Sequence, residues 1–344
     1  MMIGKKIIFI GLLCCIFLLL YIYNYRENMI RHTDNFLAMD TQISFIVYGN
    51  NAETALQLAK VRIMQLEDLL SVTDKCSDVY AINHSEGKLI KISNDTSNII
   101  QFALNMAKDT DGALDPTIYP LLKVWGFTTD NYKIPDEKSI AELLPYIDYK
   151  KVKLINNTII LPKGMELDLG AVAKGYTSDE VIKLWRSQGI SSALINLGGN
   201  VQTLGVKPDG SLWKIGIKAP QGAGNLGVLQ IGETAVITSG SYERYFIGED
   251  GKKYWHILNP VTGKPAQSGF KSVTIVGDSG KQCDALSTAI FVMGKPKAVD
   301  YWQAKRNFEM ILVTQENEIW ITEGIVNAFT LQPEYADLTV RVIK

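Results

Sequence analysis

The stretch SLWKIGIKAPQGAGNLGVLQIGETAVITSGSYERYF, residues 211–246, decides the fold class. It holds one strand signal after another, separated only by short turns, and more strand signals lie on both sides of it. Because strands here follow strands instead of alternating with helices, the sequence predicts an α+β fold with largely antiparallel sheets and packed helices. The expected strands cover 39–49, 152–161, 192–198, 212–218, 228–231, 234–247, 254–258 and 271–276, and a hairpin covers 308–322.

Apolar residues at helical spacing mark the helices that are expected to cover these sheets. In 52–71 they include Ala55, Ile63 and Leu70, so this segment predicts an amphipathic helix. No G-x-G-x-x-G motif follows a strand and opens a helix, which argues against a Rossmann nucleotide site. Further helices are expected at 96–109, after Cys283 and at 296–305.

Composition and charge narrow the classes of partner. The chain has 344 residues, of which 47% are hydrophobic and 21% charged, as in ordinary globular proteins. Its net charge of −1 gives no reason to expect nucleic acid. Outside the N-terminal apolar run, the cysteines are Cys76 and Cys283; they form no CxxC and are expected as isolated thiols. The 3 histidines of the chain are too few for a His-rich metal site.

The N-terminus differs in kind from the rest of the chain. Residues 7–25 carry no charge, and Lys5 and Lys6 precede them. A helix of about 20 apolar residues spans a bilayer, and no Ala-x-Ala cleavage site follows this run. We therefore expect an uncleaved signal-anchor, a transmembrane helix, over 1–25, with the lysines inside and the bulk of the chain extracytoplasmic. A polar stalk over 26–38 and one domain over 39–344 would follow. Lipidation at Cys14 or Cys15 is the less favoured alternative.

The motif CDALSTAIFVMG, residues 283–294, places a carboxylate and a hydroxyl on one face of a helix. Asp284 and Thr288 are four residues apart, while Leu286 and Ile290 fall on the face that can pack into the core. Asp284 could simply cap the helix, and the residues alone favour that interpretation. Alternatively, the two oxygens could bind a hard cation such as Mg²⁺.

Two further motifs also have a structural and a functional interpretation. In DLGAVAKGYTSD, residues 168–179, Asp168 could cap a helix, Gly170 and Ala171 allow a close approach of the backbone, and Lys174 could meet a phosphate. A plain strand-to-helix corner with a solvated lysine is the alternative. INLGGN, residues 195–200, is a strand that ends in Gly-Gly, which is better evidence for a turn than for a ligand.

His256 lies in WHILNPVTGKP, residues 255–265, where a strand is expected. A single histidine on a strand is more often structural than catalytic. It is nevertheless the one histidine near a candidate site, and imidazole is the side chain best suited to accept a proton near neutral pH.

Taken together, these motifs resemble those of the FAD:protein FMN transferases, the ApbE family. The resemblance spans roughly residues 36–325, and its specificity comes from the common order of the motifs. In chain order they are MDT (39–41), DGALDPTIYPLLKVWGF (111–127), LDLGAVAKGYTSD (167–179), INLGGN (195–200), TSGSYER (238–244), HILNPVTGKP (256–265) and CDALSTAIFVMG (283–294).

The resemblance implies an ApbE, T-fold-like architecture and a particular chemistry. Such enzymes bind FAD with Mg²⁺ and transfer its FMN half to a threonine or serine hydroxyl of a target protein, releasing AMP. Acceptor flavoproteins of membrane or surface electron transfer would be the partners. The implied metal ligands are Asp284, Thr288 and the Ala171 carbonyl, with Ser287 nearby. The implied FAD contacts are Met39, Ala113, Leu114, Asp115, Asp168, Lys174 and Leu258.

The acceptor hydroxyl is a poor nucleophile and needs a base, for which His256 is our hypothesis and Asp284 the rival. Two other functions compete with the transfer. An FAD pyrophosphatase would use the same metal site with water as the nucleophile and give FMN and AMP. A non-enzymatic flavin-binding surface protein would need no hard-cation site, so the Asp284 and Thr288 pair argues against it.

Overall fold

The computed structural model describes residues 29–129, 131–221 and 224–344. The predicted signal-anchor at 1–25 lies outside these residues. Among the described residues, no helix is both long and apolar enough to cross a bilayer. Strand β1 (Arg31–Ala38) begins two residues after the described part starts and pairs along its whole length with β2 (Thr41–Tyr48). The predicted stalk at 26–38 is therefore wrong for residues 31–38. These residues form a strand paired with β2, and the burial of their side chains alternates along it.

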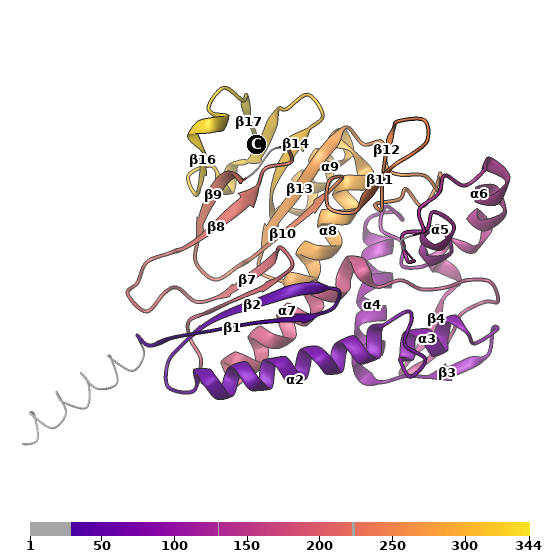
Figure 1. Cartoon of the computed structure of the whole chain (residues 1–344), viewed down its shortest axis with the longest axis horizontal. Helices are drawn as coiled ribbons and strands as arrows, with labels where there is room; N and C mark the ends of the chain where they lie inside the picture. The colour runs from indigo at the N-terminus through magenta and orange to yellow at the C-terminus, as the bar shows by residue number, and fades with distance from the viewer. Residues whose placement is uncertain (1–28, 130, 222–223) are drawn as a thin grey trace, which may run out of the picture.

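A nine-stranded sheet forms the centre of the described molecule (Figure 1). Neighbouring strands run antiparallel except β15 and β17, which are parallel. This confirms the α+β fold with largely antiparallel sheets. After β1 and β2 the order is β6 (Ala193–Leu197), β7 (Asn200–Leu204), β10 (Ala235–Gly240), β13 (Phe270–Gly277), β14 (Glu309–Thr314), β15 (Ile319–Thr322) and β17 (Val340–Ile343).

The helices cover one face of this sheet. Phe45 of β2 packs edge-on against Trp185, with ring centroids 5.3 Å apart, in a cluster that joins the sheet to two helices. In β14, Met310 and Leu312 face the helices, as period-2 alternation requires. The α-helices are α2 (Ala52–Leu70), α3 (Asp78–Asn83), α4 (Asn94–Asp109), α5 (Tyr119–Val124), α6 (Glu137–Leu143), α7 (Gly170–Ser187), α8 (Gly280–Met293) and α9 (Lys295–Lys305).

Smaller sheets complete the described fold. A three-stranded sheet packs on the opposite face of the main sheet, where it meets Ile311 and Val313 of β14. Its strands are β16 (Phe329–Leu331), β9 (Asn225–Ile231) and β8 (Trp213–Lys218). A second has β3 (Leu89–Lys91), β5 (Thr158–Ile160) and β4 (Lys153–Ile155), and β11 (Tyr245–Ile247) pairs with β12 (Lys253–Trp255). Short 3-10 turns are η1 (Leu144–Tyr146), η2 (Tyr149–Lys151), η3 (Glu323–Ile325) and η4 (Pro333–Tyr335).

Two predicted strands differ from the observed ones in a way that matters for the site. The run predicted at 234–247 is two strands, β10 and β11, which belong to different sheets because a turn at 241–244 separates them. His256 lies one residue past the end of β12 rather than within a strand. Cys76 is exposed and Cys283 is buried, and both are free thiols, as expected.

Candidate active site

Helices α7 and α8 approach each other closely at two glycines. A Cβ on Gly175 would lie 2.2 Å from the Gly280 carbonyl oxygen, and one on Gly280 would lie 2.7 Å from the Gly175 oxygen. Only glycine fits such distances, because real Cβ contacts are never so short. The crossing brings the DLGAVAKGYTSD segment, which forms the start of α7, against the side chain of Asp284 on α8.

Asp284 is buried at this crossing and is held by two neighbours. Its Oδ2 accepts a hydrogen bond from the Gly175 N–H at 2.8 Å, and its Oδ1 accepts one from the Asn200 amide at 2.9 Å. Burial raises the pKa of Asp284, and the charge of Lys174 opposes this rise. Because α8 begins at Gly280, Asp284 lies inside the helix, and the interpretation of this residue as an N-cap is wrong.

Asp179 caps α8 instead, from the neighbouring helix. Its carboxylate accepts hydrogen bonds from the N–H of Gly280 at 2.6 Å, the N–H of Lys281 at 3.2 Å and the hydroxyl of Ser279 at 2.9 Å. The Gln202 amide donates to the same carboxylate at 2.9 Å. An acid at a helix N-terminus satisfies free N–H groups and complements the helix dipole. Asp179 therefore fixes the helix that carries Asp284.

Replacing Asp179 by alanine is expected to lower the free energy of unfolding by about 2 kcal/mol, the upper end for a lost helix cap. Urea titration of the folded domain measures this loss. Asp209→Ala is the matched control, because Asp209 accepts bonds only from Ser211 in an exposed turn. The cap assignment would be contradicted if both variants unfolded at the same urea concentration.

Three hydroxyls lie one turn further along α8 and on β10. The buried Ser287 hydroxyl donates to the Asp284 carbonyl at 2.8 Å, so it accepts from Ser239 at 2.8 Å. Thr288 lies 3.4 Å from Ser239 and is partly exposed. Of the two residues on α8, Thr288 therefore has the hydroxyl that remains available to a ligand, while Ser287 is engaged within the protein.

The start of α7 carries both the Ala171 carbonyl and Lys174. In a regular helix the Gly175 N–H would donate to the Ala171 carbonyl, and here it also donates to Asp284, so the Ala171 carbonyl shares this donor. The Ala171 oxygen, which is at the partly exposed start of the helix, thus keeps capacity for another partner. Lys174 lies close enough to influence the pKa of Asp284, Asp168 and His256.

Asp168 lies immediately before α7. The N-cap of α7 is Leu169, so the prediction that Asp168 itself caps the helix is wrong by one residue; instead its Oδ1 accepts a hydrogen bond from the Gly170 N–H, the first of the helix, at 2.9 Å. Burial raises its pKa, while the bond from Gly170 and the charges of Arg244 and Lys174 oppose the rise. Its own N–H donates to the Pro116 carbonyl at 2.8 Å and so links α7 to the loop that follows α4.

His256 has a defined tautomer. Its Nδ1 lies 3.1 Å from the Arg244 carbonyl oxygen, which can only accept, so Nδ1 carries the hydrogen and Nε2 is left as the acceptor. Burial and then the neighbouring charge of Arg244 lower the pKa of His256 to about 4. The imidazole is therefore neutral at pH 7, the form that can accept a proton.

The remaining predicted FAD contacts lie in several different parts of the fold. Met39 is at the turn between β1 and β2, with a φ of 53°, and its N–H donates to Glu67 at 2.7 Å. Ala113 and Leu114 follow α4, in the loop linked to Asp168. Both oxygens of Asp115 are engaged within the protein: Oδ1 accepts from Thr117 in the same loop and Oδ2 from the Tyr149 N–H of η2. Leu258 is buried in a separate cluster with Leu121, Trp125 and Phe127.

The donor set restricts what could be bound here. In the three described segments of the chain, no group of three or more His, Cys, Asp or Glu side chains is placed to hold a metal ion. A cation beside Asp284 would have one carboxylate, the Thr288 hydroxyl and the Ala171 carbonyl. This set suits Mg²⁺, which takes few protein oxygens and completes its shell with water and phosphate oxygens. The second lone pairs of the Asp284 oxygens remain for it.

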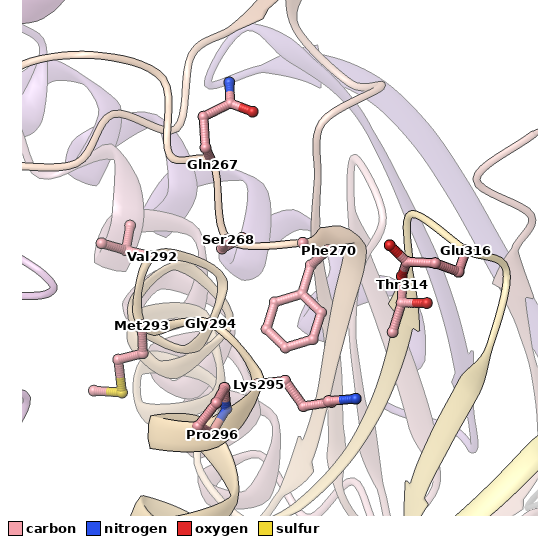
Figure 2. Close-up of a pocket in the computed structure, with 11 residues that line it drawn as sticks. Gln267, Ser268, Phe270, Val292, Met293, Gly294, Lys295, Pro296, Thr314 and Glu316 are labelled. Atoms are coloured by element: carbon pink, nitrogen blue, oxygen red, sulfur yellow. The ribbon is translucent and has the colours of Figure 1, made fainter.

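A surface pocket elsewhere on α8 is not part of this centre. It has a volume of about 350 Å³ and lies between β13, the end of α8 and the start of α9, where Phe270, Met293 and Lys295 line it (Figure 2). Met293 is nine residues after Asp284, which is about 14 Å along a helix. The pocket therefore opens at the far end of α8.

Fold and site together define a class of α+β proteins in which two closely packed helices bring a buried carboxylate, a nearby lysine and a partly exposed threonine hydroxyl to the same part of the fold. The model of the ApbE family matches residues 39–312. The chain belongs to this family, and the resemblance in its motifs is confirmed.

Relatives named FAD:protein FMN transferase agree. One from Klebsiella pneumoniae is 35% identical over 287 residues, which cover 82% of this chain and 88% of the relative. One from Treponema pallidum is 30% identical over 341 residues, covering 92% and 94%. The crystal structure of an ApbE protein from Thermotoga maritima has a TM-score of 0.82 at 32% identity, and covers 87% of this chain and 99% of that one.

Proposed function

We propose that this protein transfers the FMN half of FAD to a threonine or serine hydroxyl of extracytoplasmic target proteins. The acceptor oxygen forms a bond to the phosphorus that carries riboflavin, the bond from that phosphorus to the AMP phosphate breaks, and AMP leaves. The observation that carries the proposal is the Asp284 centre: a buried carboxylate at the crossing of α7 and α8, held by the Gly175 N–H and Asn200 and close enough to Lys174 for its charge to oppose the raised pKa, in a chain whose relatives are named for this reaction.

Mg²⁺ is the proposed cofactor. Asp284, Thr288 and the Ala171 carbonyl would hold it, and when bound it would neutralise charge on the diphosphate. The chain's own residues do the rest. Lys174 supplies positive charge where the leaving phosphate becomes more negative. Asp179 caps α8, and the Gly175 N–H binds the Asp284 carboxylate. Together they would hold Asp284 in position for the proposed cation.

His256 is the proposed general base. With hydrogen on Nδ1 and a free Nε2, it can take the proton of the acceptor hydroxyl as the new P–O bond forms. Asp284, the rival, has both oxygens engaged by Gly175 and Asn200, and the cation would use the remaining lone pairs. The geometry therefore favours His256.

Replacing His256 by alanine should slow the transfer by about 10²- to 10⁴-fold, the usual contribution of a general base. FAD binding, measured by quenching of flavin fluorescence, should be preserved, because no bond from the His256 side chain holds α7 or α8. Near-normal transfer in the variant would remove His256 from the mechanism.

The lowered pKa of His256, about 4, predicts the pH dependence of this step. The base works only when neutral, so activity should persist at pH 6 and 5 and be lost as pH falls through about 4. An unperturbed histidine would lose activity near pH 6.5 instead. The logarithm of kcat/KM against pH gives the midpoint, and a limb at 6.5 that disappears in His256→Ala would contradict the assigned environment.

The location and the partners are part of the proposal. The charge-free run at 7–25, preceded by Lys5 and Lys6, would anchor the protein in the cell membrane with its folded domain outside. Acceptor flavoproteins of membrane or surface electron transfer would then be within reach. Fractionation of cells that express the full chain, with protease added from outside, tests the orientation: a protected domain would contradict it.

Mass spectrometry of a co-expressed acceptor tests the function. The expected result is one FMN phosphate on a threonine or serine, with AMP released in equal amount. If the purified protein with FAD and Mg²⁺ instead gives free FMN and AMP at the same rate with or without acceptor, it is an FAD pyrophosphatase. If FAD is bound and unchanged in both reactions, it is a flavin-binding protein without this activity.

A further inference from the structure

A chain of hydroxyls joins β10 to α8. The strand packs against this helix (Figure 1), and Ala235 and Ile237 belong to the core cluster on the face of β10 that also carries Ser239. The Ser239 hydroxyl lies 2.8 Å from that of Ser287 and 3.4 Å from that of Thr288. Thr288 is a proposed metal ligand and Ser239 is not, so the role of Ser239 beside it is a separate question.

The direction of donation along this chain follows from one bond. The Ser287 hydroxyl has a single hydrogen, and it donates that hydrogen to the Asp284 carbonyl at 2.8 Å. The contact between Ser287 and Ser239 must therefore use the hydrogen of Ser239. Because Ser239 has no second hydrogen, it can only accept from Thr288, and the Thr288 hydrogen points toward Ser239.

This direction suits the binding of a cation at Thr288. A cation is bound by the lone pairs of an oxygen and is repelled by a hydroxyl hydrogen, so the hydrogen has to point elsewhere. A bound cation would also polarise the hydroxyl and strengthen its donation to Ser239, because linked hydrogen bonds reinforce one another. The separation of 3.4 Å is longer than the usual value of about 2.8 Å, so this contact can shorten when the oxygen binds a cation.

We propose that Ser239 is a positioning residue for the cation site, which accepts the Thr288 hydrogen and so keeps the Thr288 oxygen available to the metal ion. This inference rests on the proposed function, because the cation is the one that Asp284, Thr288 and the Ala171 carbonyl would hold for FAD. Ser239 acts through Thr288 and has no contact of its own with the metal ion. Its loss should therefore weaken metal binding and leave the chemistry at phosphorus unchanged once the metal ion is bound.

Ser239→Ala tests the proposal by direct measurement of metal binding. The probe is Mn²⁺, which takes oxygen ligands as Mg²⁺ does, and the EPR signal of the free ion reports its binding to the full chain with FAD and without acceptor. The dissociation constant for Mn²⁺ should rise about 10- to 100-fold, the usual effect of losing a partner of a metal ligand. Saturating Mg²⁺ should restore the transfer rate, and the affinity for FAD in the absence of metal ions should not change.

Thr238→Val is the matched control, and Ser239→Thr is the conservative variant. The Thr238 hydroxyl lies 2.8 Å from that of Thr274, which is opposite it on β13, and adjacent strand residues face opposite sides of a sheet. Thr238→Val thus removes a similar hydroxyl pair away from α8. Both variants should bind Mn²⁺ as the wild type does. If Ser239→Ala also bound Mn²⁺ as the wild type does, the positioning role would be wrong and the proposed function would stand.

A double-mutant cycle shows whether Ser239 acts through Thr288. Thr288→Val alone should weaken Mn²⁺ binding, because it removes a ligand oxygen. Adding Ser239→Ala to this variant should then have no further effect, since the oxygen that Ser239 positions is gone. Additive effects would contradict the proposal. If Asp284→Asn bound Mn²⁺ as tightly as the wild type, the cation would lie elsewhere, and the proposed metal site and this inference would fail together.

The unaltered protein offers a test that does not depend on how any variant folds. In a crystal structure with Mn²⁺ and FAD, the distance between the Ser239 and Thr288 hydroxyl oxygens should be shorter than 3.4 Å. A metal ion bound to Thr288 while the Ser239 hydroxyl is turned away from it would overturn the positioning role.

Discussion

Asp284→Asn should slow FMN transfer about 10³-fold without unfolding the protein. Stabilisation of transition-state charge by a bound cation is worth several kcal/mol, and each 1.36 kcal/mol corresponds to a factor of ten in rate. Asparagine keeps the shape of the side chain and an oxygen for the Gly175 N–H, but it loses the negative charge. Burial raises the pKa of Asp284, so removing its charge stabilises the folded state, whereas the new amide no longer accepts the Asn200 hydrogen bond, a loss of about 1 kcal/mol; these effects oppose each other, and the free energy of unfolding at pH 7 should stay within about 1 kcal/mol of wild type.

Single-turnover transfer assays and urea unfolding measure the two parts of this prediction. Asp136→Asn is the control, because Asp136 is an exposed carboxylate that caps α6 and should leave the rate unchanged. A variant at Asp284 that unfolds more easily and transfers FMN at the normal rate would assign the residue a purely structural role.

Gly175→Ala should both destabilise the protein and remove its activity. The added methyl would lie 2.2 Å from the Gly280 carbonyl oxygen and 2.7 Å from the Asp284 Cβ, and both neighbours are parts of a packed helix. Overpacking of this kind costs about 1–3 kcal/mol. The helices must separate to relieve it, which moves Asp284 away from the Ala171 carbonyl and should reduce transfer by more than 100-fold, since small displacements in an active site carry costs of that size.

Gly232→Ala is the matched control for this substitution. A Cβ at Gly232 would meet only Val206, at an ordinary 3.7 Å. Its unfolding midpoint and transfer rate should stay close to wild type. If Gly175→Ala behaved in the same way as Gly232→Ala, the close crossing of α7 and α8 would not be what positions the site.

Much of the fold could be predicted because its elements have strong local patterns. The helix at 52–71 and the strands near 192–198 and 212–218 were found within one or two residues of α2, β6 and β8. Strand β1 was missed, because its first five residues, including Asp34 and Asn35, are all charged or polar and show no alternation in the sequence; among the described residues it is also an edge strand. A polar edge strand resembles a stalk when only its composition is considered.

The site was harder to predict because its contacts join distant parts of the chain. Asp284 and Thr288 were recognised from their spacing, but Asp179, about 100 residues from the helix that it caps, was not. The Gly175 and Asn200 bonds to Asp284 also carry no local signal. The cap interpretation of Asp284 failed because the start of α8 depends on Asp179, which only the tertiary structure brings there.

A crystal structure with FAD and Mg²⁺ tests the central claim most directly. We predict a metal ion about 2.1 Å from the Asp284 carboxylate, the Thr288 hydroxyl and the Ala171 carbonyl, with diphosphate oxygens of FAD in its remaining positions. The account would be contradicted if the nucleotide bound elsewhere and Asp284 kept Gly175 and Asn200 as its sole partners.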